Sequence, residues 1–292
     1  MNKEFDKGLL LAGFGSFWWG FIGVLYFRYL TFIGHVELVV HRCLWTTFTL
    51  IITTIFFSKW QIFLKIIKDK RNLIYLFFSG LLIFINWAVW IYAVSTERII
   101  DASFGYFIMP ILSVMLGYFF FNEKLNKKRI FSISLVIISI LYLILISFKS
   151  LPWVGLIVAI SWAVYNLLRK KINIDTDVGL LIESLFILPF AVIAFYIITI
   201  NGNNDFKLSE PLMMIVIFLA GPMTVIPLFL YVRGVELCGL GATGMIFYIT
   251  PTLQFLLGFF YYDEPFSLIK LVSFIFIWIA VIIYLKDLYE TN

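Results

Sequence analysis

Long apolar runs follow one another along the whole chain and restrict it to one broad class of fold. Each run has about 18 residues or more, enough for a helix to cross the roughly 30 Å hydrocarbon core of a bilayer. Because 62% of the residues are hydrophobic and only 13% are charged, the sequence predicts an all-α membrane protein without a soluble domain. The ten predicted transmembrane helices cover 8–29, 36–57, 72–95, 102–121, 130–147, 151–168, 178–200, 211–232, 241–262 and 267–285.

Basic residues gather in alternate connections between these runs. The main clusters are KDKR at 68–71, EKLNKKR at 123–129 and RKK at 169–171. Because Lys and Arg collect on the cytoplasmic side of membrane proteins, both termini are predicted to be cytoplasmic. The clusters are short and flank membrane helices, so the net charge of +5 favours the lipid bilayer as partner and argues against nucleic acid.

Sequence signals for an enzyme, a metal or a cofactor are missing. Cys43 and Cys238 belong to different halves of the chain, so a structural disulfide is not expected. With two histidines and no close group of Cys, His, Asp and Glu, we expect no metal site. The motifs GxSxG, HExxH and GxxxxGK[ST] do not occur, so we predict a protein that is not an enzyme, uses no ATP and carries no cofactor.

A proline pattern occurs twice, in SFGYFIMPILSVMLGYFFFNEK and in GMIFYITPTLQFLLGFFYYDEP. Pro110 and Pro251 take the same place in the two copies, 141 residues apart, and each is followed at the same intervals by a glycine and a glutamate. The pattern predicts two five-helix repeats, 7–147 and 151–286. Because five is an odd number, the second repeat enters the membrane from the opposite side, which makes the repeat inverted.

An inverted repeat of this kind commonly builds an alternating-access transporter with its substrate near the middle of the membrane. A proline inside a helix leaves a backbone carbonyl without its usual partner and bends the helix. We therefore predict that Pro110 and Pro251 are hinges beside a polar cavity. The alternative is that prolines and glycines are simply common in membrane helices.

Six segments spread over nearly the whole chain carry a family likeness: HRCLW (41–45), NWAVWIYAV (86–94), DASFGYFIMP (101–110), ISWAVYNLLRKK (160–171), GPMTVIPL (221–228) and YITPTLQFLL (248–257). Together they resemble the RarD branch of the EamA-type drug/metabolite transporters. The resemblance implies the drug/metabolite transporter fold, a ten-helix, multi-pass carrier of small metabolites in the bacterial inner membrane with a central cavity.

The chain departs from that branch at two positions beside the prolines. Met109 stands where the branch has an asparagine, and Phe247 stands where it has a glutamine. Gln254 lies two helical turns beyond Phe247 on the same face and is expected to replace one of the missing polar groups.

Aromatic and amide side chains on the presumed cavity helices are the predicted substrate-binding residues. Aromatic faces stack on planar ligands or hold cations, and an amide in mid-helix needs a partner. The competing interpretation is that the aromatic side chains pack or form belts at the membrane interface. The predicted residues are Asn86, Trp90, Tyr106, Trp19, Trp162, Tyr165, Tyr231, Tyr248 and Gln254.

Three ionisable residues inside predicted helices are candidates for charge binding or proton coupling. Arg42 and Glu183 lie at similar depths from opposite sides of the membrane, so we expect no ion pair between them. In the functional interpretation, Arg42 or His41 receives an anionic group, Glu183 receives a cationic one, and His41 or Glu183 carries a coupling proton. In the structural interpretation each pairs locally, Arg42 with Glu37 or with backbone carbonyls.

The sequence thus predicts a secondary transporter that moves a small polar metabolite, amino-acid-like or aromatic, by alternating access. One alternative is a drug exporter of the kind suggested by the chloramphenicol-sensitivity phenotype after which the branch is named. The other is a non-transporting membrane scaffold or receptor that keeps the fold. We expect a monomer or a weak homodimer.

Overall fold

The computed structural model describes residues 3–96, 99–147, 153–172, 174–202, 204–207, 209–261 and 268–291, and these form helices joined by short connections. The first half of the chain contains α1 (Lys3–Phe17), the π-helix η1 (Trp18–Gly23), α2 (Val24–Tyr29), η2 (Leu30–Phe32), α3 (His35–Phe56), α4 (Trp60–Ile66), α5 (Lys70–Ser95), α6 (Ile99–Phe121) and α7 (Lys127–Ser147). The second half contains α8 (Trp153–Lys171), α9 (Thr176–Ile200), α10 (Pro211–Phe218), α11 (Ala220–Ile246), α12 (Ile249–Phe260) and α13 (Leu268–Thr291).

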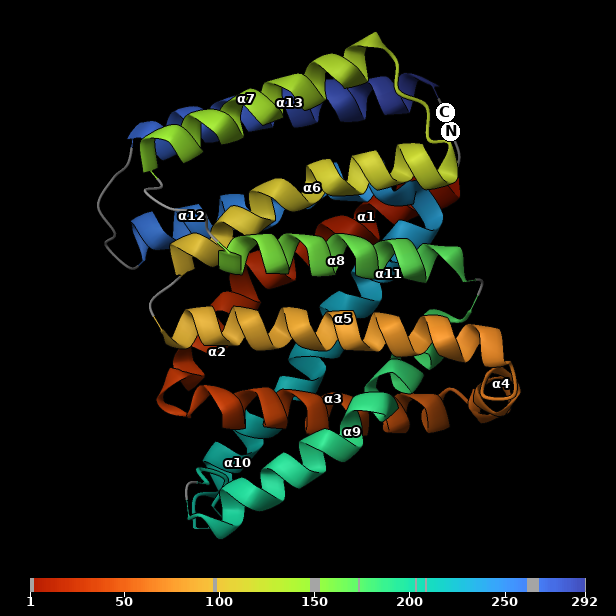
Figure 1. Cartoon of the computed structure of the whole chain (residues 1–292), viewed down its shortest axis with the longest axis vertical. Helices are drawn as coiled ribbons and strands as arrows, with labels where there is room; N and C mark the ends of the chain where they lie inside the picture. Colours follow the sequence, from red (N-terminus) through yellow and green to blue (C-terminus); the bar gives the residue numbers. More distant parts are fainter. Residues whose placement is uncertain are drawn as a thin grey trace.

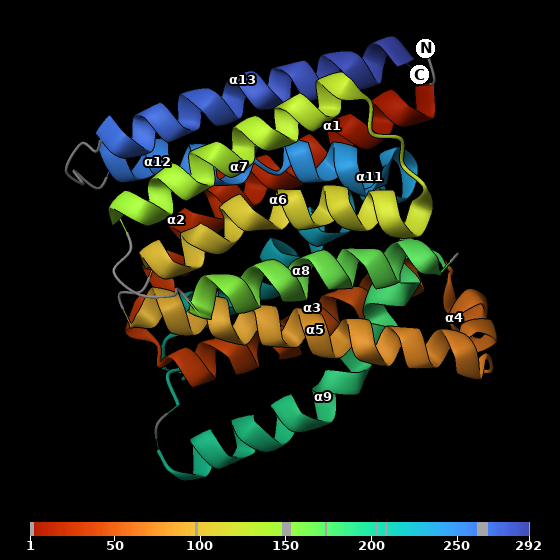
Figure 2. The ribbon, with the colours of Figure 1, turned by 45° about the horizontal axis from the view of Figure 1, so that its top comes forward.

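The long helices lie side by side in a stack (Figure 1). The pair α7 and α13 forms one edge and α9 the opposite edge, with α1, α6, α8, α11, α5 and α3 between them (Figures 1 and 2). Both chain ends lie at the same end of the helices (Figures 1 and 2), and Phe5 of α1 packs in one cluster with Leu288 of α13. We call this end the terminus end.

The outer faces of the bundle carry large apolar side chains. Phe14 is 63% exposed, Phe190 70% and Leu145 81%. Side chains of this size are rarely left exposed in groups by a protein surrounded by water. A lipid surrounding accounts for them, as the composition predicts.

Most of the predicted apolar runs coincide with helices within the described residues, but the predicted run 211–232 is divided at Leu219 and the predicted connection 233–240 lies inside α11. Six stretches are long and apolar enough to cross a membrane: Lys3–Phe32, His35–Phe56, Lys70–Ala93, Thr176–Ile200, Pro211–Gln254 and Leu271–Glu290. The all-helical membrane fold is therefore confirmed within the described residues, while the count of ten spans stays a prediction. The short helix α4 was not predicted.

The second proline does not lie in mid-helix, where the sequence placed it. The predicted helix 241–262 is divided at Phe247 and Tyr248, and Pro251 falls in the first turn of α12. A proline is tolerated there because the first amides of a helix have no partner within it. Pro110, in contrast, lies inside the continuous helix α6. The two prolines thus occupy different local structures despite their matching sequence positions.

A sharp reversal within α11 positions the start of the next helical segment. Gly239 has φ +90° and ψ 169°, a conformation that side-chain-bearing residues rarely adopt. The segment after it crosses α6 closely, since a Cβ added at Gly244 would lie 2.8 Å from Cβ of Ser113. This crossing brings the C-terminal end of α11 against Pro110 at the centre of the bundle.

Candidate functional site

A cavity in the middle of the bundle collects five of the nine predicted substrate-binding residues. Its lining comes from both halves of the chain and consists of Trp19, Gly23, Phe27, Arg42, Asn86, Trp87, Trp90, Tyr106, Trp162, Phe247 and Thr250. The predicted residues among them are Trp19, Asn86, Trp90, Tyr106 and Trp162. Their shared location makes this cavity the candidate site.

Aromatic rings form one wall of the cavity. Trp19 meets Trp162 edge-on, with ring centroids 5.1 Å apart, and Phe247 lies 6.3 Å from Trp19. Tyr231 is fully buried behind these rings, 5.5 Å from Trp162, and its hydroxyl donates to the carbonyl of Thr243. The wall is therefore a packed, preformed surface suited to an apolar or planar group.

Asn86 finds the partner that a buried amide requires. Its Nδ2 donates to the carbonyl oxygen of Val158 at 3.0 Å and to Oγ of Ser161 at 3.1 Å. These bonds fasten α5 to α8 at the lining of the cavity. The amide is thus held in a fixed orientation by the helix opposite.

Arg42 is the one cationic side chain among the described residues that line the cavity. It is 5% exposed, and its Nε donates to Oγ1 of Thr224 at 3.1 Å. The guanidinium carbon lies 4.7 Å from the ring centroids of both Phe27 and Trp87. The predicted local pairing with Glu37 is wrong, because Glu37 bonds His41 instead.

His41 contacts a different set of residues from Arg42, although the two are adjacent in the sequence. Its Nε2 lies 3.2 Å from Oε1 of Glu37, its Nδ1 accepts from Nε1 of Trp45, and its ring contacts Phe206. Neighbouring residues on a helix point about 100° apart. His41 therefore lies in a buried cluster outside the set of cavity-lining residues.

The remaining predicted residues lie behind or away from the cavity. Tyr165 is buried one turn beyond Trp162 on α8 and stacks on it at 5.3 Å. Tyr248 belongs to a separate apolar cluster and donates to the carbonyl of Phe107 at 2.9 Å. Gln254 is half-buried on α12 and is not part of the lining. The structure therefore does not bring Tyr248 and Gln254 to the candidate site.

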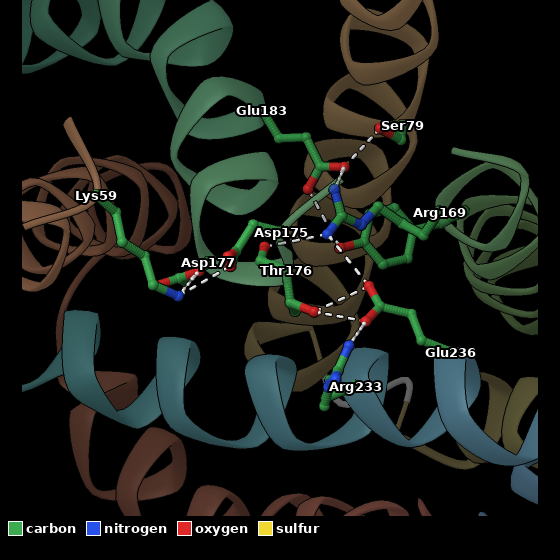
Figure 3. Close-up of polar contacts among 10 residues, drawn as sticks. Lys59, Ser79, Arg169, Asp175, Thr176, Asp177, Glu183, Arg233 and Glu236 are labelled. Atoms are coloured by element: carbon green, nitrogen blue, oxygen red, sulfur yellow. Dashed lines mark hydrogen bonds and ion pairs between the residues drawn. The ribbon is translucent and has the colours of Figure 1, made fainter. Parts of the chain in front are cut away.

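Glu183 lies at the centre of a second buried group, shown in Figure 3. Its carboxylate accepts from Oγ of Ser79 at 2.6 Å and from the hydroxyl of Tyr165 at 3.2 Å, and Nη1 of Arg169 lies 3.5 Å away. Glu183 and Arg169 are 2% and 1% exposed. A buried carboxylate is thus neutralised by a buried guanidinium, with two hydroxyls completing its hydrogen bonds.

Arg169 also extends this group toward the terminus end. Its Nη2 donates to the carbonyl of Thr176 and lies 4.0 Å from Oε1 of Glu236 (Figure 3). Glu236 accepts from Thr176 Oγ1 at 2.8 Å and pairs with Arg233 at 2.8 Å. A side chain at Gly179 would overlap the Arg169 guanidinium, so this glycine provides the space for it. We call Ser79, Tyr165, Arg169, Thr176, Glu183 and Glu236 the Glu183 network.

Two further polar contacts join the first half of the chain to the second at the same end. Nζ of Lys59 lies 2.9 Å from Asp175 and 2.8 Å from Asp177 (Figure 3). Burial alone lowers the pKa of Lys59, but the hydrogen bonds to Asp177 and Asp175 more than offset it and raise this pKa overall.

The other contact is formed by Glu123, which we call the Glu123 cap. It accepts from the backbone N–H groups of Leu240 at 2.8 Å and Gly241 at 2.9 Å, directly after the reversal at Gly239, and it pairs with Lys170 at 3.2 Å. A carboxylate is favoured here because these amides begin a helical segment and have no partner within it.

Sequence reasoning missed Arg169, Glu236 and Thr224 as functional candidates. Arg169 was counted with the basic cluster RKK that marks a cytoplasmic connection. Its spacing carried a signal, because Trp162, Tyr165 and Arg169 recur at three- and four-residue steps and so share one face of α8. Within the described part of the chain, no group of three or more His, Cys, Asp or Glu is placed to hold a metal ion.

Comparison with known proteins identifies a family and relatives whose similarity extends over nearly the whole of this chain. The model of the EamA-like transporter family matches residues 6–145 and again residues 150–286. The chain is 33% identical over 286 residues to an uncharacterized transporter of Vibrio cholerae, covering 98% of this chain and 94% of that protein. It is 32% identical over 290 residues to protein RarD of Escherichia coli, covering 99% and 97%. A solved crystal structure that is 13% identical has a TM-score of 0.70 over 95% of this chain and 96% of that one, which shows a shared fold.

Proposed function

Because the chain belongs to the EamA-like transporter family, we propose that it is a secondary transporter which moves a small polar metabolite by alternating access. The family resemblance drawn from the sequence motifs is confirmed, and the chain is a multi-pass membrane transporter. The proposal goes further in naming an amino-acid-like or aromatic substrate, the bacterial inner membrane, ten spans in two inverted repeats, and cytoplasmic termini.

The observation that carries the proposal is the central cavity and its position between the two predicted repeats. Trp19, Arg42 and Asn86 come from the first repeat, whereas Trp162 and Phe247 come from the second. A relative movement of the repeats therefore changes the shape of the cavity. Inverted repeats that place a site at their interface use such a movement to expose it to each side of the membrane in turn.

Polar contacts that join the repeats at the terminus end support this movement. Glu123 meets Lys170, and Ser79 meets Glu183. Each pair has one member in 7–147 and the other in 151–286. The pair of Glu123 and Lys170 is partly exposed, so water can replace it readily. We propose that these contacts hold the terminus end closed in one state and separate in the other.

A chain of contacts connects the cavity to a group able to carry a proton. Trp162 lines the cavity and stacks on Tyr165, whose hydroxyl donates to Glu183. His41 bonds Glu37 and Trp45 in its own cluster, and its contacts with described residues do not include a lining residue of the cavity. Of the two candidates for proton coupling, the proposal therefore assigns the role to Glu183.

Flux in liposomes tests the function directly. Purified protein is reconstituted, and counterflow of labelled tryptophan, phenylalanine, phenylacetate and chloramphenicol is measured against protein-free liposomes. We expect saturable flux of at least one of the three metabolites. Flux of chloramphenicol alone would favour drug export, and absence of all flux would favour a scaffold or receptor.

A cross-linked variant serves as the matched control. Cysteines at Glu123 and Lys170, in a chain whose own two cysteines are replaced by alanine, are bridged with a cleavable bifunctional thiol reagent. The proposal predicts that flux stops on bridging and returns on cleavage, because the repeats can then separate again. Undiminished flux in the bridged protein would contradict alternating access at this end.

A further inference from the structure

The cavity contains a cation, Arg42, that has no carboxylate partner among the described residues. In the part of the chain that the structure describes, Arg42 forms no ion pair, and its single hydrogen bond runs from Nε to the hydroxyl of Thr224. The buried carboxylates of the described residues have other partners: Glu37 lies against His41, Glu183 against Arg169, Asp177 against Lys59 and Asp287 against Arg129. The described residues that line the cavity include no carboxylate side chain.

An unpaired guanidinium at this depth is costly for the protein. Removing a charged group from water costs several kcal/mol unless a counter-ion and hydrogen bonds compensate. Arg42 is 5% exposed and its plane lies beside the rings of Phe27 and Trp87. Cation–π contacts with two rings compensate only part of that cost. A ligand that brings a negative charge can compensate the rest of that cost.

The position of the guanidinium is fixed before any ligand arrives. The Thr224 hydroxyl holds Nε, and the two rings hold the plane. The N–H groups on Nη1 and Nη2 have no acceptor among the described residues, and the side chain lines the cavity. A pair of such donors fits the two oxygens of a carboxylate in a bidentate arrangement.

The other walls restrict the rest of the ligand. Trp19, Trp162 and Phe247 offer aromatic faces, whereas Asn86, Tyr106 and Thr250 offer a few polar groups. A cavity whose described lining has one cation, no anion and aromatic walls matches a ligand with one negative charge and an apolar or planar body.

We propose that the cavity binds an organic monoanion whose carboxylate is held by Arg42 and whose apolar body lies against the wall formed by Trp19 and Trp162. The inference rests on the proposed function only in taking this anion to be the transported substrate. Binding itself does not require transport, so the two can fail separately.

Matched pairs of acids and amides test the inference. Binding of phenylacetate and phenylacetamide, and of cinnamate and cinnamamide, is measured by calorimetry with the full chain in nanodiscs at neutral pH. Each pair differs in charge but hardly in shape. We expect the acid of at least one pair to bind about 10-fold or more tightly than its amide, equivalent to about 1.4 kcal/mol. Equal affinity within both pairs, or no binding of either acid, overturns the proposal.

Variants identify the side chain that is responsible for the preference for the acid. Arg42→Gln removes the charge and should abolish the preference for the acid, while Arg42→Lys should retain part of it. Lys171→Gln removes one exposed cation far along α8 and should leave the preference unchanged, which separates a local effect from one of net charge. A preference that survives in Arg42→Gln overturns the assignment.

The liposome experiment separates this inference from the proposed function. Acid-selective binding that depends on Arg42, in a protein without flux, would leave the anion site standing and refute transport. Flux of a metabolite that is equal in the original protein and in Arg42→Gln would leave transport standing and refute the anion site.

Discussion

Two buried arginines of this protein differ in what surrounds them. Arg169 on α8 is 1% exposed and lies beside two carboxylates, Glu183 at 3.5 Å and Glu236 at 4.0 Å. Arg42 on α3 is 5% exposed and lies beside the rings of Phe27 and Trp87 instead. The first cation has carboxylate partners, whereas the second has none among the described residues.

The difference separates a structural charge from a binding charge. Arg169 holds α8 to α9 and, through Glu236, to α11. A cation with such partners contributes to the folded state as long as none of them is removed. Arg42 faces a cavity that both predicted repeats line, and its Nη1 and Nη2 groups have no acceptor within the described part of the chain. A cation of that kind costs stability and is explained by what it binds.

The largest expected effect concerns Arg169. Arg169→Met leaves Glu183 buried without its cation, and the loss of stability should be about 3–5 kcal/mol. Thermal and denaturant unfolding in detergent would measure it. Adding Glu183→Gln to this variant should restore most of the loss, because the uncompensated charge is then removed. Equal stability of the single variant and the original chain would mean that the pair contributes nothing.

Glu183→Gln alone should affect transport more than folding. The glutamine keeps one of the two oxygens that accept from Ser79 and Tyr165, and Glu236 remains as a counter-charge for Arg169. It cannot take up or release a proton. We expect uptake driven by a pH gradient to be lost while substrate exchange between equal pools continues. His41→Asn should keep pH-driven uptake, since His41 lies in a separate cluster. The reverse pattern would assign the coupling proton to His41.

A smaller effect is expected for the Glu123 cap. Glu123→Gln replaces one of the two carboxylate oxygens that accept from Leu240 and Gly241. The contact should weaken by about 1–2 kcal/mol, and the terminus end should open more often. Cys238, half-buried beside Gly239, is a native reporter whose alkylation should become roughly 10-fold faster in a Cys43→Ala background. Lys127→Gln at the same end is the control, and an equal rate in all three proteins would argue against the cap.

The two prolines should differ, although the repeat made them equivalent. Pro110→Ala restores a backbone hydrogen bond inside α6 and should reduce the rate of flux. Pro251→Ala falls in the first turn of α12, where no bond is missing, and it should change flux less than 2-fold, about 0.4 kcal/mol on a logarithmic scale. Flux measured side by side decides this, and a larger effect at Pro251 would restore the symmetric hinge predicted from the sequence.

Much of the fold was predictable because it depends on chain composition alone. A run of apolar residues forms a helix in lipid wherever it occurs, since backbone groups there must bond within the segment. The positions at which one helix ends and the next begins were less predictable. Pro251 pointed to a bend near the right place, but the division lies at Phe247 and Tyr248, where the helix ends before the proline instead of bending at it.

The candidate site was predictable only where the face of the helix that carries a residue packs toward the cavity. Trp19 and Asn86 lie at the cavity as expected, whereas Tyr248 bonds Phe107 in another cluster. The face that a helix turns toward its neighbours depends on packing, which one sequence does not reveal. The same reason explains why His41 and Arg42, adjacent in the chain, lie in different surroundings, and why Arg169 was interpreted as part of a loop.

The most direct test of the central claim is the unfolding temperature of Arg42→Met, measured without ligand beside that of Arg169→Met. Methionine keeps the length and apolar character of the side chain and removes the charge. If Arg42 is an uncompensated binding charge, its variant should unfold at the same temperature as the original chain or higher, while Arg169→Met unfolds well below it. A fall in Arg42→Met as large as that in Arg169→Met would mean that both arginines are structural and would contradict the account.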